Sequence, residues 1–148
     1  MAFRLFTTLA LIAGFLVVPA VAPAIAQQAP ISDQDRAAIR AIIQDQVDAF
    51  RRDDGETAFR LASPMIRDLF GTADVFIGMV RQGYPMVYRP KVFNFAGVVT
   101  LNGVPTQKVH VVGPDGRRST AFYPMTRLPD GSWRIDGCYL KAADENQV

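Results

Sequence analysis

The segment VRQGYPMVYRPKVFNF, Val80–Phe95, decides the fold, because the apolar periodicity of the chain changes within it. Before Gly83 the apolar residues recur every three or four positions, as in amphipathic helices. After Gly83 they alternate with polar residues, as in strands. Gly83 itself suits the left-handed residue that closes a helix, and Pro85 and Pro90 stiffen the connection. The sequence therefore predicts a helical half followed by a sheet.

Helices are predicted over four stretches that precede this segment. The first covers about residues 33–52, with Ser32 as its N-cap. The second covers about 56–62, the third about 64–70 and the fourth about 73–82. The apolar faces predicted for them, in order, are Ile39, Ile42, Ile43, Val47 and Phe50; Ala58, Phe59 and Ala62; Met65, Ile66, Leu69 and Phe70; Val75, Phe76, Met79 and Val80.

Four antiparallel strands are predicted after it. Asn102-Gly103 between the first two is a strong hairpin signal. The third strand, 119–128, contains Pro124, which has no N–H and so predicts a bulge or an edge strand. The residues that alternate along the other three strands are Phe93, Phe95, Val99 and Leu101; Gln107, Val109 and Val111; Trp133, Ile135 and Tyr139. This order predicts an α+β fold, with helices packed on a curved four-stranded meander and a cavity between the layers.

The N-terminal segment has the layout of a secretory signal peptide. Met1–Arg4 is short and basic, Leu5–Val18 is apolar and uncharged, and Ala24-Ile25-Ala26 fits a cleavage site. An uncleaved membrane anchor is the alternative, because the uncharged run is nearly long enough to span a bilayer. Cleavage predicts a periplasmic or secreted protein with no membrane attachment. The expected organisation is a signal peptide at 1–26, one domain at 27–141 and a flexible tail at 142–148.

Composition narrows the function classes. The formal net charge is only +2 and the basic residues are scattered, which argues against a nucleic-acid partner. Cys138 is the only cysteine, so no internal disulfide forms; we expect it to be buried on a strand, or else to form an intermolecular bond. His110 is the only histidine, and no cluster has the spacing of a metal site. We therefore expect no metal and no cofactor.

Two stretches resemble a known family. These are AFRRDDGETAFRLASPMIRDLFGTADVFIGMVRQGYPMVYRP, residues 49–90, and YPMTRLPDGSWRIDGCYL, residues 123–140. They are similar to an uncharacterised bacterial family, domain of unknown function 4864, and the resemblance covers about residues 39–140. It implies a nuclear-transport-factor-2-like, cystatin-like cone, a fold shared with ketosteroid isomerases and many binding proteins. It implies no activity, since a shared fold does not determine function.

The candidate ligand site begins in the segment quoted first. Tyr84, Tyr88 and Arg89 are expected at the mouth of the cone, where aromatic walls with a few polar groups form a small-molecule pocket. The alternative is structural, with the tyrosines closing the open end of the cone, because a tyrosine ring is apolar and its tip is polar. The two interpretations are compatible, because such a seam often borders a pocket.

Polar residues of the strands extend this candidate site. Gln107 has the parity of Val109 and Val111 and is expected to face inward, where a cavity lined by Gln107, Tyr123 and Arg127 could hold a ligand. Asp136 is the best candidate for a general base, since burial would raise its pKa. Its alternation with Trp133 and Ile135 instead predicts that it faces away from the helices.

Three hypotheses follow for function. The first is a non-catalytic binding or accessory domain for a small hydrophobic molecule, which predicts that Tyr84, Tyr88, Gln107 and Arg127 converge. The second is an acid–base isomerase or dehydratase, which predicts a carboxylate inside the cavity. The third is an interaction module that uses the outer face of the sheet and forms a homodimer. The outer face expected on the last strand consists of Arg134, Asp136, Cys138 and Leu140.

Overall fold

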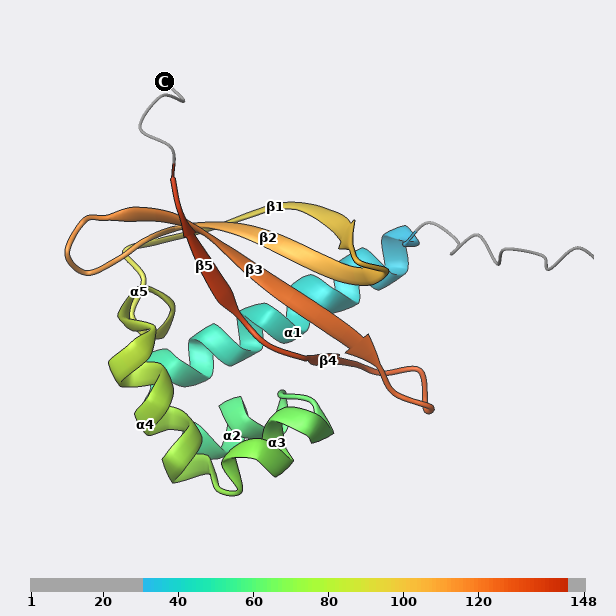
Figure 1. Cartoon of the computed structure of the whole chain (residues 1–148), viewed down its shortest axis with the longest axis horizontal. Coiled ribbons are helices and arrows are strands. Elements are labelled where there is room, and N and C mark those ends of the chain that lie inside the picture. Colours follow the sequence, from blue (N-terminus) through green and yellow to red (C-terminus); the bar gives the residue numbers. More distant parts are fainter. Residues whose placement is uncertain (1–30, 144–148) are drawn as a thin grey trace, which may run out of the picture.

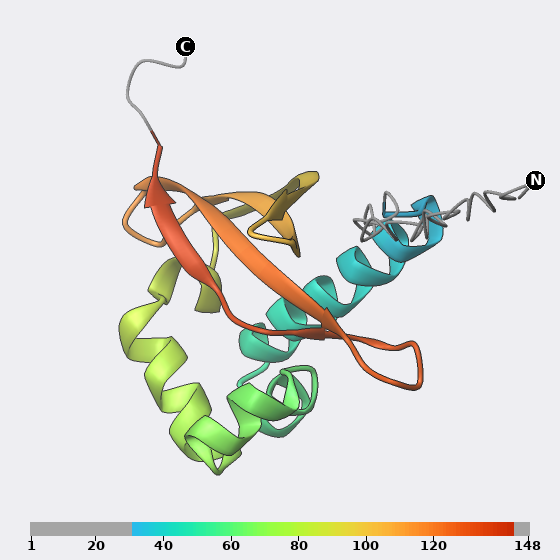
Figure 2. The ribbon, with the colours of Figure 1, turned by 45° about the vertical axis from the view of Figure 1, so that its right-hand side comes forward.

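The computed structural model describes residues 31–143. The predicted signal segment, 1–26, therefore lies outside the described residues, as does 144–148 of the predicted tail. Within the described residues, five helices come first and five strands follow, so the predicted α+β order is confirmed. Figures 1 and 2 show all the helices on one side of the sheet. Among the helices of residues 31–143, none combines the length and the apolar character that crossing a bilayer requires.

Side-chain caps position the four predicted helices, α1 (Asp33–Arg51), α2 (Gly55–Arg60), α3 (Pro64–Phe70) and α4 (Ala73–Gly83). The side-chain oxygens of Ser32, Asp54, Ser63 and Thr72 each accept a hydrogen bond from a backbone N–H in the first turn. Such caps satisfy donors that have no partner inside the helix. The predicted boundaries are correct to within about two residues, because the caps are local and visible in the sequence.

A fifth helix, α5 (Pro85–Tyr88), lies in the connection that Pro85 and Pro90 were expected to stiffen, where no helix was predicted. Pro85 occupies its first turn, which proline tolerates because the N–H there has no partner inside the helix. Met86, Val87 and Tyr88 are buried. The segment Val80–Phe95 is thus a structural seam that packs into the core, and α5 contacts α1, α4 and the sheet.

The sheet is antiparallel, with order β1 (Val92–Leu101), β2 (Val104–Val112), β3 (Arg118–Arg127) and β4 (Trp133–Ile135); β5 (Tyr139–Ala142) also pairs with β3. The predicted Asn102-Gly103 hairpin is confirmed, with both residues at positive φ (49° and 81°). The strand β5 reaches Ala142, one residue into the segment predicted as a tail.

A bulge in β1 corrects the simple alternation predicted for that strand. Phe95 pairs with Val109, but Val98 pairs with Gln107, so β1 carries one extra residue between them. The prediction that Val99 and Leu101 continue the face of Phe93 and Phe95 is therefore wrong. Gly97 lies within this bulge and was a usable signal, because an isolated glycine in a strand pattern often marks a bulge.

A bulge or an edge strand was predicted at Pro124, but β3 runs through Pro124 with partner strands on both sides. The irregularity lies in the partner strand opposite Pro124. The carbonyl of Pro124 accepts from the N–H of Asp136 at 2.8 Å, so its missing N–H faces the same partner strand. There three residues, Asp136–Cys138, oppose the two residues Tyr123 and Pro124, and Gly137 has φ 149°. The single last strand that was predicted is therefore split into β4 and β5 by a bulge.

The bulge at Asp136–Cys138 reverses the side-chain parity of the last strand. Cys138 turns to the inner side of the sheet and Leu140 packs against the core. Tyr139 instead lies on the outer face, where its ring stacks on Phe122 at a centroid distance of 5.0 Å. The outer face predicted from Arg134 to Leu140 is therefore wrong at Cys138 and Leu140, because one extra residue shifts every later side chain.

The core lies between the helices and the inner face of the sheet. Ile39, Ile43, Val47 and Phe50 of α1 are buried, as predicted. In α4 the buried face includes Ile77 where Val75 was predicted, and Val75 is 56% exposed. The helix α3 has no fully buried residue, and its predicted apolar side is only half correct: Ile66 and Phe70 pack on the core, while Met65 (58%) and Leu69 (71%) are exposed.

Candidate functional site

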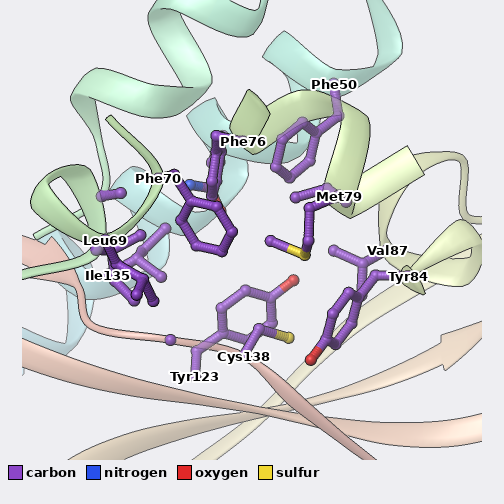
Figure 3. A pocket seen from close by; sticks show the side chains of 15 residues that line it. Phe50, Leu69, Phe70, Phe76, Met79, Tyr84, Val87, Tyr123, Ile135 and Cys138 are labelled. Atoms are coloured by element: carbon purple, nitrogen blue, oxygen red, sulfur yellow. The ribbon is translucent and has the colours of Figure 1, made fainter. Parts of the chain in front are cut away.

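A cavity of about 200 Å³ lies between the helices and the β3–β4 side of the sheet (Figure 3). Four helices, the strands β3 and β4 and the bulge that follows β4 all contribute to it. The segment that links α2 to α3 is held to β4 by two backbone hydrogen bonds, which places α3 beside the opening. The residues that line the cavity are Gln46, Phe50, Ala62, Ile66, Leu69, Phe70, Phe76, Met79, Val80, Tyr84, Val87, Tyr123, Ile135, Gly137 and Cys138.

Aromatic rings form the helical wall of the cavity. Phe76 is at its centre, with ring centroids 6.1 Å from Phe50, 5.6 Å from Phe70 and 5.4 Å from Phe59. Tilted and edge-on pairs at these distances are favourable aromatic arrangements. The rings hold one another in place, so the wall is preformed and apolar.

Four side chains bring polar atoms to this lining: Gln46, Tyr84, Tyr123 and Cys138. The buried amide of Gln46 donates to the carbonyl of Ala58 at 3.0 Å, which fixes it to α2. Tyr123 is 1% exposed, and its hydroxyl has no hydrogen-bond partner within residues 31–143. Figure 3 shows this hydroxyl pointing from β3 into the cavity, on the side of Met79.

Burial favours the neutral forms of Tyr123 and Cys138. It raises the pKa of the Tyr123 hydroxyl well above its usual value, and the Cys138 sulfur beside it raises that pKa further. Burial also raises the pKa of the Cys138 thiol to about 12, although a hydrogen-bonding interaction with Tyr123 acts in the opposite direction. The two groups influence each other, but their atoms do not reach ordinary hydrogen-bond geometry. Both shifts favour the protonated forms near neutral pH, which disfavours a role as nucleophile or base.

Exposed apolar side chains border the opening. Leu69 lines the cavity and also reaches solvent, and Met65 lies one turn earlier on the same helix. The helix that carries them, α3, runs between the Ser63 cap and Gly71, whose φ is 73°. The opening therefore lies beside a short helix that buries little of its own surface.

Only two of the six predicted site residues line the cavity. Tyr84 and Tyr123 meet there, one from the end of α4 and one from β3. Tyr88, Arg89, Gln107 and Arg127 lie elsewhere, so the expected convergence of Tyr84, Tyr88, Gln107 and Arg127 is wrong. Whether any of the six binds a ligand stays a prediction.

Tyr88 and Arg89 belong to a polar cluster at the end of α1. The Tyr88 hydroxyl donates to Asp53 Oδ1 and accepts from Arg81 at 3.1 Å. Arg89 pairs with Asp53 Oδ2 at 2.8 Å, and both guanidinium groups lie over the Tyr88 ring, at 5.3 and 5.5 Å from its centroid. The Tyr88 hydrogen bond, followed by the Arg89 one, lowers the pKa of Asp53. This cluster joins α1, α4 and α5, which supports the structural interpretation of Tyr88.

Gln107 is fully buried, as predicted, but its side chain hydrogen-bonds the backbone at the β1 bulge. Its amide nitrogen donates to the carbonyls of Ala96 (2.6 Å), Lys108 (2.7 Å) and Gly97 (3.4 Å). These contacts satisfy backbone acceptors that the bulge leaves without a strand partner. The amide nitrogen is therefore bonded as expected for buried glutamine, whereas its Oε1 has no hydrogen-bond partner among residues 31–143. The side chain faces the backbone of β1 instead of the cavity.

Arg127 and Asp136 also lie away from the cavity lining. Arg127 donates to the carbonyl of Gly131 at 3.0 Å, pairs with Asp35 at 3.7 Å and covers the Trp133 ring. Asp136 is half-buried beside the bulge and does not line the cavity. Among residues 31–143, no group of three or more histidine, cysteine or acidic side chains is placed to hold a metal ion.

Sequence reasoning missed most of the lining. Phe50, Phe70, Phe76 and Met79 were predicted to be apolar and inward, but a periodic pattern cannot distinguish a packed core from the wall of a cavity. Gln46 carried a usable signal, since it is a polar residue with the helical spacing of Ile39, Ile43 and Phe50. Cys138 could not be placed without the bulge.

Comparison with protein families gives one match, which covers most of the chain: the family model described as Domain of unknown function (DUF4864) matches residues 32–148. Comparison with curated proteins and with solved structures gives no match.

Proposed function

This chain belongs to the family described as Domain of unknown function (DUF4864), and we propose that it is a non-catalytic binding or accessory domain that holds a small hydrophobic molecule in its cavity. The observation that carries the proposal is the lining: aromatic and aliphatic side chains from helices and sheet enclose the space, with few polar groups among them. Small-molecule sites in proteins commonly have this composition.

The volume limits the size of the ligand. A dry cavity of about 150 Å³ in an engineered protein binds benzene, while pockets for drug-sized molecules span about 300–1,000 Å³. The cavity of about 200 Å³ therefore suits a molecule of roughly one ring. Any longer substituent would extend out of the opening beside Leu69. Tyr84 and Tyr123 are the two residues of the originally predicted site that we retain as ligand contacts.

The lining supports binding more than acid–base chemistry. It contains no carboxylate and no imidazole, and burial holds the pKa of both Tyr123 and Cys138 high enough to keep them protonated. The tyrosine–carboxylate pair of Tyr88 and Asp53 lies on the other side of α5, outside the lining. An isomerase or dehydratase acting in this cavity would have no base within reach of its substrate.

Export, fold family and assembly complete the proposal. The segment 1–26 supports export to the periplasm or to the medium. The order of helices and antiparallel sheet with an internal cavity supports a nuclear-transport-factor-2-like cone. A homodimer through the outer sheet face is supported by the exposed ring of Tyr139, which stacks on Phe122 on that face.

The test is native mass spectrometry of the protein purified from its own host, followed by extraction of bound molecules. Two neighbouring positions on α3 supply matched variants. Ile66→Phe adds volume at a residue that lines the cavity, and Met65→Phe adds a ring at an exposed residue that does not.

The proposal predicts a small apolar molecule in the wild type and in Met65→Phe, and its loss from Ile66→Phe. The same spectra report the oligomeric state. A molecule retained equally by all three proteins lies outside the cavity and contradicts the proposal. A ligand-free dimer in every case would favour the outer sheet face as the working surface.

A further inference from the structure

The Tyr123 hydroxyl is the one feature of the cavity that packing does not explain. Tyrosine at a buried position normally hydrogen-bonds its hydroxyl, because an unpaired buried donor costs stability. Within residues 31–143 no protein group pairs with this hydroxyl, although the side chain is only 1% exposed. A phenylalanine would fill the same space without that cost, so the hydroxyl needs another explanation.

The hydroxyl is held in one place by its surroundings. The Tyr123 ring is packed edge-on against Phe93 at 6.3 Å, and its backbone pairs with Gln107 in the middle of β3. The ring therefore cannot swing out to solvent, and the oxygen stays directed into the cavity (Figure 3). A fixed donor in an apolar enclosure is a specificity element, since a ligand that cannot pair with it leaves it unsatisfied.

The charge of the lining restricts what can accept this bond. The cavity is lined by no lysine, arginine or histidine, and an anionic ligand buried there would lack a counter-charge. The lining also offers no carboxylate to a cation. A neutral acceptor such as a ketone, aldehyde or ether oxygen fits both conditions.

We propose that the cavity selects a small, neutral, mostly apolar molecule that carries one oxygen acceptor, and that Tyr123 donates the hydrogen bond that recognises it. This inference rests on the proposed binding function and names the ligand class of the same site. Cys138 is the neighbouring alternative acceptor, but thiol sulfur accepts weakly, and a carbonyl oxygen displaces it. The ring and chain of the ligand contact the wall around Phe76, and its oxygen lies toward β3.

The test compares two probes of the same size and shape, cyclohexanone and methylenecyclohexane, which differ in C=O against C=CH₂. Binding is followed by NMR of ¹³C-labelled methionine methyl groups, since Met79 lines the cavity and Met65 at the surface is an internal control. Each probe is titrated into the wild type and into Tyr123→Phe. For each protein we take the ratio of the dissociation constants of the two probes. Comparing this ratio between the wild type and Tyr123→Phe removes the contribution of the different hydration of the probes, because that contribution is the same for both proteins.

The expected result is a ratio that favours the ketone by about tenfold more in the wild type than in Tyr123→Phe. Tyr84→Phe removes the other lining hydroxyl, Cys138→Ala removes the thiol, and Tyr139→Phe makes the same change on the outer face. Tyr139→Phe, at a residue that does not line the cavity, should keep the wild-type ratio. A ratio lost in Tyr84→Phe or Cys138→Ala instead assigns recognition to that residue and overturns the role of Tyr123.

Two further outcomes separate this inference from the function on which it rests. If both probes shift the Met79 methyl but the ratio is unchanged in Tyr123→Phe, the acceptor selectivity is wrong and the binding function stands. If neither probe shifts the Met79 methyl up to its solubility limit, the cavity does not bind molecules of this size. The proposed function and the inference then fall together.

Discussion

Replacing Tyr123 by phenylalanine should stabilise the protein, which is the opposite of the usual effect at a buried tyrosine. The hydroxyl is enclosed and has no hydrogen-bond partner of ordinary geometry among residues 31–143, so it contributes a desolvation cost without a compensating bond. The ring contact with Phe93 remains in the variant, because only the oxygen is removed.

The magnitude follows from the cost of an unpaired donor. Leaving a buried hydroxyl unsatisfied costs about 1–3 kcal/mol, and the weak contact with the Cys138 thiol recovers part of it. We therefore expect Tyr123→Phe to raise the free energy of unfolding by about 1 kcal/mol. For a domain of this size that corresponds to a rise of about 4 °C in the melting temperature.

The assay is urea unfolding followed by circular dichroism, with Tyr88→Phe as the matched control. The Tyr88 hydroxyl donates to Asp53 and accepts from Arg81, so its loss should lower stability. The two tyrosine-to-phenylalanine changes are thus predicted to have opposite signs. A loss of 1 kcal/mol or more in Tyr123→Phe, about that of a normal hydrogen bond, would refute the argument that the hydroxyl is unpaired.

Three further predictions concern groups outside this argument. Gln107→Leu should lower the free energy of unfolding by about 2 kcal/mol, because the carbonyls of Ala96 and Lys108 lose their hydrogen-bond donor. The control is Gln82→Leu at an exposed position, and an equally small effect of both changes in the same urea assay would contradict the prediction. The hydrogen bond from Tyr88, followed by that from Arg89, lowers the pKa of Asp53 below 3.8, so the stability that the ionised Asp53 contributes is present above pH 3.8 and is lost as the pH falls further. Urea midpoints measured between pH 5 and pH 2 should therefore fall less in Asp53→Asn than in the wild type. Parallel curves for the two proteins would refute this. Burial raises the pKa of the Cys138 thiol to about 12, so iodoacetamide at pH 8 should label this thiol at least about a hundredfold more slowly than free cysteine. Labelling at the rate of free cysteine would contradict this and show that the thiol is accessible.

Local sequence signals predicted the elements well. The capping oxygens of Ser32, Ser63 and Thr72 start helices where they were expected, and Asn102-Gly103 makes the hairpin. Such signals act over three or four residues and need no tertiary context. The helix α5 was missed because Pro85 suits both the first turn of a helix and an extended crossing.

The site was less predictable, because it depends on two features that alternation does not record. The bulge at Asp136–Cys138 turns Cys138 inward and Tyr139 outward, and it lies opposite Pro124 of the partner strand. The cavity is the space left between side chains of helices and strands that are far apart in the chain, so no local pattern reveals it. Tyr84 and Tyr123 were predicted correctly as lining residues, because an aromatic ring with a polar tip suits the wall of a pocket. The same reasoning selected Tyr88, whose hydroxyl instead bonds to Asp53 outside the cavity.

The most direct test of the account is a crystal structure of the protein under xenon pressure, since xenon binds in dry apolar cavities of this size. The account predicts xenon density enclosed by Phe50, Phe76, Met79 and Tyr123, and its absence from Ile66→Phe crystals treated in the same way. Side chains that close the space in the wild type, with no xenon between α4 and β3, would contradict the claim that this domain is built around a binding cavity.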